Sequence, residues 1–269
     1  MSSVAGRLEG LTAIVAGGGQ QPGQTVGNGR AASILFARAG ATVLVGDRDA
    51  ARAGETAEMI AGEGGKAVAI ELDVTSKESC EAAVQRALDE TGRLDIVLNN
   101  VGIGGGGDTS AHWLPEDVFD RMIDVNLKGA WRMTAAAIPA LRETEGNIIN
   151  ISSLAAIATS GMTAYEVTKA ALNRLTVNVA LGNAKYGVRC NAIAPGLMDT
   201  PMAIERRAAE PGSSHETVRA ARNARVPLKG KMGNGWDTAH AALFLASAEA
   251  RFITGIVLPV DGGGGARVG

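Results

Sequence analysis

The amino-acid sequence predicts a doubly wound α/β fold, with a seven-stranded parallel sheet and helices on both of its faces. Seven short apolar runs alternate with longer segments of helical periodicity, which is typical of strands buried on both faces of a parallel sheet. A glycine-rich loop follows the first run, where doubly wound folds bind their ligands. The predicted strands are residues 12–16, 42–46, 67–72, 95–99, 147–151, 189–193 and 256–260, and the predicted helices are residues 31–39, 50–61, 77–90, 115–143, 163–185 and 238–246.

Length and composition indicate one globular domain spanning residues 1–269. The hydrophobic share is 46% and the charged share 20%, and neither a linker nor an internal repeat divides the chain. The net charge of −2 gives no overall cationic field, so nucleic acid is not an expected partner. The sequence has no run of about 18 apolar residues, so we expect no membrane-spanning helix.

The cysteines and histidines indicate neither a disulfide framework nor a metal site. Cys80 and Cys190 are the only cysteines, and we find no secretory signal, so we expect a cytoplasmic protein in which both thiols are packing residues. The histidines His112, His215 and His240 are scattered and lack metal-ligand spacing. We therefore predict no bound metal.

Six glycines lie between the first predicted strand and the following helix, in residues 17–29. Glycines here let the backbone approach a pyrophosphate, and the first helical turn offers free N–H groups. We therefore expect Gly17, Gly27, Asn28 and Gly29 to bind a dinucleotide; the alternative is a flexible loop without a ligand. The spacing allows two interpretations: Gly17 is the tight turn and is followed by inserted residues, or Gly23 takes that place.

The second predicted strand ends in Asp47, which is followed by Arg48. An acid at this strand end commonly binds the hydroxyls of the adenine ribose and repels a 2′-phosphate, which favours NAD over NADP. Arg48 could instead receive that phosphate. We expect NAD, with NADP as the alternative.

Several short motifs occur in order along these elements. They are Asn99-Asn100-Val101-Gly102, Asp124-Val125-Asn126, Asn150-Ile151-Ser152-Ser153, Tyr165-Glu166-Val167-Thr168-Lys169 and Ala194-Pro195-Gly196. Together they resemble the short-chain dehydrogenase/reductase family in its compact, single-domain, Rossmann-type form, over essentially the whole chain. The chain departs from the family pattern in the inserted glycine-loop residues and at Val101, where alanine is usual.

Tyr165 and Lys169 are four residues apart on a predicted helix, so their side chains share one face. A tyrosine has a pKa of about 10 and needs help to act as a base near neutrality. A lysine cation and a positively charged nicotinamide would together lower that pKa. The pair therefore fits general acid–base catalysis of hydride transfer.

The resemblance implies roles for further residues. Asn126, Ser153, Tyr165 and Lys169 would be catalytic: Ser153 would bind the substrate oxygen, and Asn126 would support a water that relays protons to Lys169, which also holds the nicotinamide ribose. Ser152 remains an alternative to Ser153. The additional cofactor contacts would be Asp73, Val74, Asn100, Met198 and Thr200. The resemblance also implies a homotetramer.

The substrate would be a medium-sized secondary alcohol or ketone rather than a highly charged molecule. It would be bound by residues 103–107, the segment between Ser153 and Tyr165, and a substrate loop at residues 197–235. That loop carries arginines that could bind an acidic group or, as helical periodicity favours, form a solvated face. They are Arg206, Arg207, Arg219, Arg222 and Arg225. The sequence thus predicts an NAD-dependent oxidoreductase. The alternatives are an NADPH-dependent carbonyl reductase and a catalytically silent dinucleotide-binding regulator.

Overall fold

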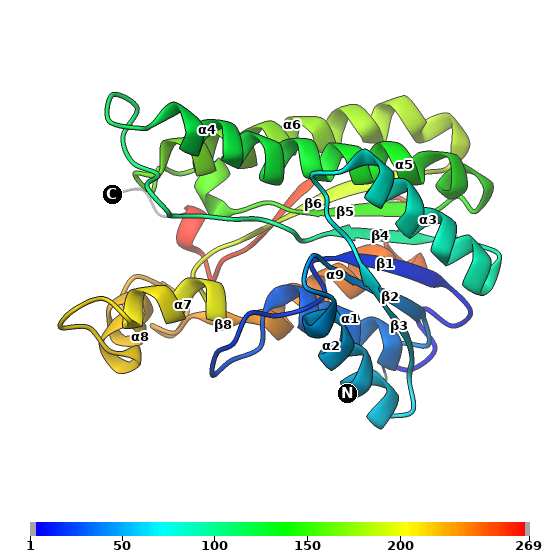
Figure 1. Cartoon of the computed structure of the whole chain (residues 1–269), viewed down its shortest axis with the longest axis horizontal. Helices are drawn as coiled ribbons and strands as arrows, with labels where there is room; N and C mark the ends of the chain where they lie inside the picture. Colours follow the sequence, from blue (N-terminus) through cyan, green and yellow to red (C-terminus); the bar gives the residue numbers. More distant parts are fainter. Residues whose placement is uncertain (1–3, 267–269) are drawn as a thin grey trace.

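The computed structural model describes residues 4–266 and is built on one seven-stranded parallel sheet (Figure 1). Its strands are β1 (Thr12–Ala16), β2 (Thr42–Asp47), β3 (Lys66–Glu71), β4 (Ile96–Asn99), β5 (Asn147–Ile151), β6 (Arg189–Pro195) and β9 (Val257–Val260). Their order is β3-β2-β1-β4-β5-β6-β9. The predicted strands are confirmed to within two residues at each end. The order reverses beside β1, which creates the crevice where such folds bind ligands.

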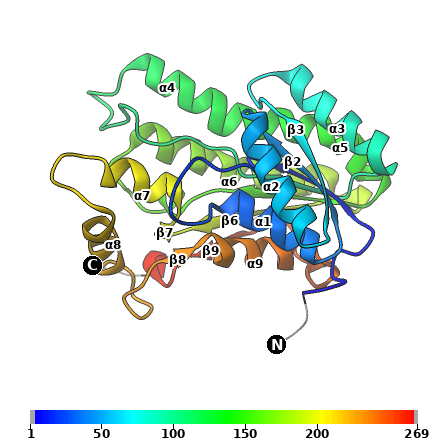
Figure 2. The ribbon, with the colours of Figure 1, turned by 60° about the horizontal axis from the view of Figure 1, so that its bottom comes forward.

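Two helical layers cover the sheet (Figures 1 and 2). On one face lie α1 (Asn28–Arg38), α2 (Ala50–Gly62) and α9 (Gly235–Ala246), and on the other lie α3 (Lys77–Thr91), α4 (Glu116–Met122), α5 (Gly129–Glu143) and α6 (Thr163–Asn183). Each layer has its own apolar core. Within β1, Ala13 and Val15 pack toward the first layer, whereas Ile14 and Ala16 pack toward the second. This period of two explains why the strands read as continuous apolar runs.

The predicted helix at residues 115–143 is interrupted in its middle. A π-helical turn, η1 (Ile123–Lys128), separates α4 from α5 and contains the fully buried Asn126. Such turns widen the backbone locally and often occur at functional sites. Periodicity could not reveal this change because the apolar pattern continues through it.

Residues 197–235 form more regular structure than expected. They contain two short helices, α7 (Pro201–Ala208) and α8 (His215–Asn223), and a two-residue parallel pair between β7 (Met198–Asp199) and β8 (Gly233–Asn234). Ser214 begins α8 with a capping box shared with Thr217. The segment therefore extends beyond the sheet as a small helical flap (Figure 1).

Both cysteines are fully buried, and burial raises the pKa of Cys80 to about 11 and that of Cys190 to about 12. This confirms them as packing residues rather than nucleophiles. Among the described residues, no helix is long and apolar enough to cross a membrane.

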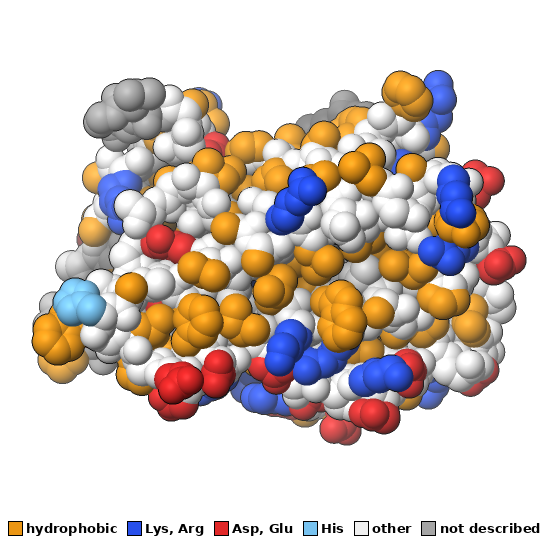
Figure 3. All heavy atoms as spheres, turned by 90° about the horizontal axis from the view of Figure 1, so that it is seen from above, with side chains coloured by type: hydrophobic (Ala, Val, Ile, Leu, Met, Phe, Trp, Pro, Cys, Tyr) orange, Lys and Arg blue, Asp and Glu red, His pale blue; other side chains and the backbone are white. Residues whose placement is uncertain are grey.

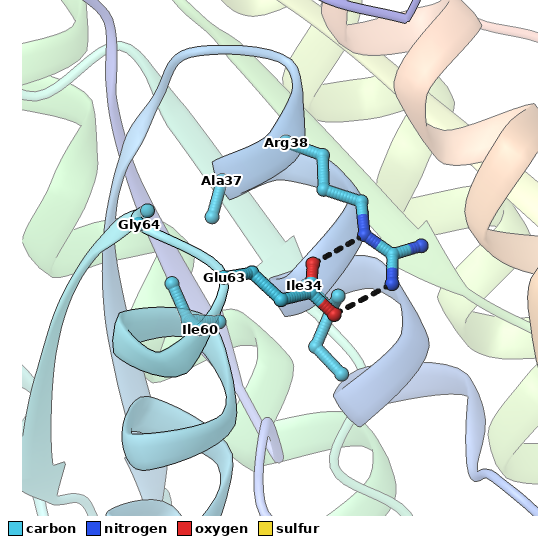
Figure 4. Close-up of a pocket in the computed structure, with 7 residues that line it drawn as sticks. Ile34, Ala37, Arg38, Ile60, Glu63 and Gly64 are labelled. Carbon is cyan, nitrogen blue, oxygen red and sulfur yellow. Dashed lines mark hydrogen bonds and ion pairs between the residues drawn. The ribbon is translucent and has the colours of Figure 1, made fainter.

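A small hollow lies where α1 and α2 end, at the opposite end of α1 from the crevice (Figure 4). The Arg38 guanidinium donates two hydrogen bonds to the Glu63 carboxylate there, at 2.6 and 2.7 Å. This bidentate pair ties the two helix ends together. The residues that line this hollow include no nucleophile, and its one acid is held by Arg38.

Candidate active site

A cleft of about 840 Å³ lies at the carboxyl ends of the parallel strands. Its lining comes from the loops after β1, β2, β4, β5 and β6 and from α6 and α7, so segments far apart in sequence meet there. The structure brings almost all of the sequence-predicted site residues to this cleft. Those that line it are Gly17, Gly27, Asn28, Gly29, Asp47, Arg48, Asp73, Val74, Asn100, Ser152, Ser153, Tyr165, Lys169, Met198 and Thr200.

Gly17 forms the tight turn after β1. Its φ of 82° lies in the left-handed region that glycine adopts without strain, and its N–H donates to the Gly46 carbonyl at 2.8 Å. The Asn100 side chain donates to the Gly17 carbonyl at 2.8 Å. Gly29 packs so closely on this carbonyl that no side chain would fit. Of the two interpretations of the glycine spacing, the structure therefore has Gly17 as the turn.

The start of α1 suits the phosphates of a dinucleotide. The N-cap residue Gly27 has no side chain to bond the first N–H groups of the helix, so they remain available to an anion. The Asn28 Oδ1 atom is buried and has no hydrogen-bond partner within residues 4–266. An uncapped helix start and an unpartnered polar atom at the cleft fit a polar ligand placed over them.

The inserted residues of the glycine loop extend from this turn toward the flap (Figure 2). The Gln20 side chain closes the base of the insertion, because its amide oxygen accepts from the Gly27 N–H at 2.7 Å and its amide group donates to the Thr25 carbonyl at 3.0 Å. At the tip, the Gln24 N–H donates to the Glu205 carboxylate at 3.1 Å. The insertion therefore spans the cleft from β1 to α7.

Asp47 lies at the end of β2 with its carboxylate turned toward the glycine loop. One oxygen accepts from the Asp49 N–H at 3.0 Å. A Cβ at Gly19 would come within 2.7 Å of the other oxygen, so the absence of a side chain there keeps this carboxylate accessible. The exposed Arg48 follows it, and Arg52 also lines this end of the cleft. The Asp47 carboxylate and two cations therefore line this end of the cleft.

Tyr165, Lys169 and Ser153 meet at the middle of the cleft. Lys169 is 3% exposed, and its ammonium donates to the Ile151 carbonyl at 2.8 Å. The same ammonium lies 5.8 Å from the centre of the Tyr165 ring. The rotation along α6 places both side chains on the face that covers the end of β5.

The electrostatic environment of this group comes mainly from burial. Burial raises the pKa of Tyr165, and hydrogen bonding by the Ser153 side chain partly opposes that rise. Burial also lowers the pKa of Lys169 from its usual 10.5 to about 8. The chain's own residues therefore favour the neutral form of the phenol.

Asn126 does not line the cleft, unlike the other predicted site residues. Its amide binds the backbone of Ile103 twice, accepting from the N–H at 2.8 Å and donating to the carbonyl at 2.9 Å. Ile103 in turn lines the cleft. Asn126 therefore fixes the cleft wall, and the π-helical turn aims its side chain at that wall.

The two candidate serines lie in different surroundings. Ser152 is 3% exposed, and its hydroxyl donates to the Lys169 backbone carbonyl at 3.3 Å. The Ser153 side chain hydrogen-bonds the Tyr165 hydroxyl, and its oxygen also accepts from the Ala155 N–H at 3.1 Å. The hydroxyl that faces the tyrosine is thus that of Ser153.

Asp108 is a site residue that sequence reasoning missed. Its carboxylate accepts from the N–H groups of Ala164 at 3.0 Å and Tyr165 at 2.8 Å, at the start of α6. The N-cap residue of α6, Met162, makes no side-chain cap of its own. A residue from a distant loop therefore caps the helix that carries Tyr165. The only sequence signal for this capping role is the position of Asp108 between the fourth strand and the next helix.

The substrate side of the cleft is mixed in character. Met162, Met198 and Met202 supply apolar lining, together with Gly104 and Gly105, whereas Ile157 is 58% exposed and lies outside it. Four of the five flap arginines also line the cleft: Arg206, Arg207, Arg222 and Arg225. The fifth, Arg219, pairs with Asp199 at 2.9 Å.

Comparison with known proteins agrees with this geometry. The family model described as enoyl-(acyl carrier protein) reductase matches residues 24–264. The chain is 37% identical to L-fucose dehydrogenase of Bos taurus, over 96% of this chain and 90% of that protein. It is 33% identical to the 3-oxoacyl-(acyl-carrier-protein) reductase FabG of Thermotoga maritima, over 96% and 98%.

A solved structure from Burkholderia xenovorans, described as a short-chain dehydrogenase/reductase, superposes with a TM-score of 0.89 at 37% identity, covering 98% of this chain and all of that one. The similarity extends through the sheet and the flap, and it includes sequence as well as fold. The chain belongs to the short-chain dehydrogenase/reductase family of oxidoreductases.

Proposed function

We propose that the protein is an NAD-dependent oxidoreductase that transfers hydride between a nicotinamide cofactor and a secondary alcohol or ketone. The observation that carries this proposal is the meeting of Tyr165, Lys169 and Ser153 in a cleft whose other end is an uncapped helix start. The two ends of the cleft then have different roles. The glycine turn and Asp47 hold the dinucleotide, and α6 presents the acid–base group.

When bound, the nicotinamide supplies the carbon that accepts or donates hydride. In oxidation, the ionised Tyr165 oxygen accepts the hydroxyl proton of the alcohol and becomes the neutral phenol, while Ser153 hydrogen-bonds the same substrate oxygen. In reduction, the neutral Tyr165 returns that proton to the developing alkoxide. Lys169 places a cation beside the phenol, which favours its ionised form when further positive charge enters the cleft.

Asp47 supports NAD as the cofactor. Its carboxylate stands at the end of β2, where it would accept the ribose hydroxyls and repel a 2′-phosphate. Arg48 and Arg52 support the alternative, an NADPH-dependent carbonyl reductase. Parallel titrations with NADH and NADPH test the choice: at least about tenfold tighter NADH, or 1.4 kcal/mol, is expected, and tighter NADPH would reverse it.

The variant Tyr165→Phe separates an enzyme from a catalytically silent regulator. We expect turnover to collapse while NADH still binds, since the phenyl ring keeps its packing and loses only the proton-transferring oxygen. Turnover that survives in this variant would contradict the mechanism. NADH binding without turnover in the wild type, over a broad panel of alcohols and ketones, would favour the regulator.

We further propose that residues 1–269 act as one domain, with residues 197–235 as its substrate loop, in a cytoplasmic homotetramer. Apolar side chains gather over the outer face of the α4, α5 and α6 layer (Figure 3). Trp131 on α5 and Leu181 on α6 are 53% and 71% exposed. A face of this kind supports subunit packing, which sedimentation analysis would test.

A further inference from the structure

The flap places a group of four arginines on the substrate side of the cleft, and most of them lack a carboxylate partner among the described residues. Arg206 and Arg207 come from α7, and Arg222 and Arg225 come from the end of α8 and the turn after it. Within residues 4–266, Arg207, Arg222 and Arg225 form no ion pair with a carboxylate, and Arg206 has only the exposed Glu210 at 3.4 Å. Cations that stabilise a fold are usually paired.

Burial and the repulsion between their like charges both lower the pKa values of two of these arginines. Burial and the neighbouring Arg207 and Arg225 lower the pKa of Arg222 to about 10. Burial, followed by the charge of Arg206, lowers the pKa of Arg207. Arg207 and Arg222 donate to uncharged acceptors: Arg207 to the Ala203 carbonyl at 2.7 Å and Arg222 to the Met198 carbonyl at 3.3 Å. Like charges gathered in a cleft create a positive potential that an anion would relieve.

Arg206 lies beside the glycine segment that packs against Tyr165. Its guanidinium packs on Gly105, where an added Cβ would lie 3.0 Å from Cζ. The preceding residue, Gly104, packs against the ring of Tyr165, since a Cβ there would lie 3.5 Å from two ring carbons. Two consecutive glycines therefore lie between the Arg206 guanidinium and the Tyr165 ring.

We propose that the substrate carries an anionic group, a carboxylate or a phosphate, which Arg206 binds with support from Arg207 and Arg222. This inference deepens the proposed function, because it names the class of alcohol or ketone that the Tyr165 site takes. The methionines beside the arginines give the rest of the molecule an apolar wall. A hydroxy acid or keto acid with a short apolar chain would bind the arginines through its carboxylate and pack its chain on the methionines.

The charge pattern at the other end of the cleft argues against the cofactor diphosphate as the natural partner of this group. The diphosphate already has the uncapped start of α1 and the glycine turn. The flap arginine nearest to the inserted loop, Arg219, is neutralised by Asp199 and bonded to Gln24. Arg206, by contrast, packs on Gly105 on the tyrosine side of the cleft.

The test is calorimetric titration of the NADH complex with butyrate, butyramide and inorganic phosphate at constant ionic strength. We expect the wild type to bind butyrate or phosphate at least about tenfold more tightly than butyramide, which corresponds to 1.4 kcal/mol. Arg206→Gln should abolish this preference. A matched control, Arg86→Gln, removes an exposed arginine of α3 and should leave it intact.

Arg222→Lys keeps a charge but loses the planar fork, so it should weaken anion binding without unfolding the flap. Tighter phosphate than butyrate would assign the anion as phosphate, and the reverse would assign it as carboxylate. Equal binding of butyrate and butyramide by the wild type would overturn the proposal. So would an Arg206→Gln variant that loses NADH affinity but keeps its butyrate preference, since the arginine would then serve the cofactor.

The binding experiment is independent of turnover. If Tyr165→Phe loses activity and still binds butyrate like the wild type, both proposals hold. If no alcohol is turned over and the anion preference is nevertheless lost in Arg206→Gln, the proposed reaction fails while the anion site stands.

Discussion

The backbone N–H of Gln24 donates to the carboxylate of Glu205 at 3.1 Å, although 181 residues separate them in the sequence. The same carboxylate binds His215 Nε2 at 2.7 Å through its other oxygen, and Arg219 donates to the Gln24 side chain at 3.0 Å. Glycine loop and flap thus close over the cleft from opposite sides. We therefore expect release of a bound cofactor to depend on opening of this junction.

Glu205→Ala should therefore accelerate release of NADH. The variant removes the acceptor of the Gln24 N–H and the partner of His215, so the junction opens more often. We expect dissociation to be faster by about threefold, the scale of one surface hydrogen bond, in stopped-flow displacement. Glu216→Ala, on the same flap but outside the junction, is the control. An unchanged dissociation rate would show that the junction does not limit release.

Asp108 should position Tyr165 through the helix start. Asp108→Ala removes two charge-assisted hydrogen bonds to the first turn of α6, and loss of such a cap costs about 1–2 kcal/mol. We expect a free energy of unfolding lower by that amount and a kcat reduced by about tenfold, because small displacements of a catalytic group are costly. Urea denaturation and steady-state kinetics measure the two effects.

Asp108→Asn supplies the control for a positioning role, because its amide oxygen can still accept one of the two N–H groups. It should recover part of the kcat, with KM near the wild-type value. A loss of stability without any loss of kcat in Asp108→Ala would make the residue purely structural.

The strands and the cleft could be predicted from sequence because their determinants are local. A buried parallel strand such as β5 is a short apolar run, and the residues that follow it necessarily lie at the ligand crevice. Ser153 and Asn100 are found in this way, as strand-end residues whose strand is recognisable. The spacing of Tyr165 and Lys169 is likewise a property of one helix.

What escaped prediction depends on contacts between distant segments. Asp108 lies 56 residues before the first N–H that it caps, and Gln24 meets Glu205 only after the whole sheet has formed. The flap arginines looked like a solvated face because periodicity shows that side chains share a helix face but not what that face meets. Sequence alone could not tell that α7 turns Arg206 toward the cleft.

Asp47→Ser should shift cofactor preference toward NADPH. The change removes the negative charge that we propose faces the ribose, and it leaves Arg48 and Arg52 to receive a 2′-phosphate. We expect the ratio of the NADPH and NADH dissociation constants to change by at least about tenfold, or 1.4 kcal/mol, in fluorescence titrations. Adding Arg48→Gln to this variant should cancel part of the gain. An unchanged ratio in Asp47→Ser would remove Asp47 from cofactor selection.

Lys169→Met should stabilise the fold at neutral pH while it abolishes turnover. Burial lowers the pKa of Lys169 from 10.5 to about 8, so keeping this ammonium charged at pH 7 costs about 3 kcal/mol of folding free energy. The variant also loses the hydrogen bond to the Ile151 carbonyl, which lowers its stability by about 1 kcal/mol. The free energy of unfolding of the variant should therefore exceed that of the wild type by about 2 kcal/mol at pH 7. Such a cost is expected where a charge is buried for function.

The sign of the pH dependence distinguishes this cause from simple repacking. Between pH 8 and 10.5 the unfolded wild type binds more protons at Lys169 than the folded wild type, so folding of the wild type becomes more favourable as pH rises through this window. The variant lacks this term, and its advantage should shrink steadily over the same range. Urea denaturation of both proteins at pH 7, 8, 9 and 10 measures the difference, and other titrating groups cancel in the comparison. A stability difference that stays constant across the window would mean that Lys169 is not a buried cation.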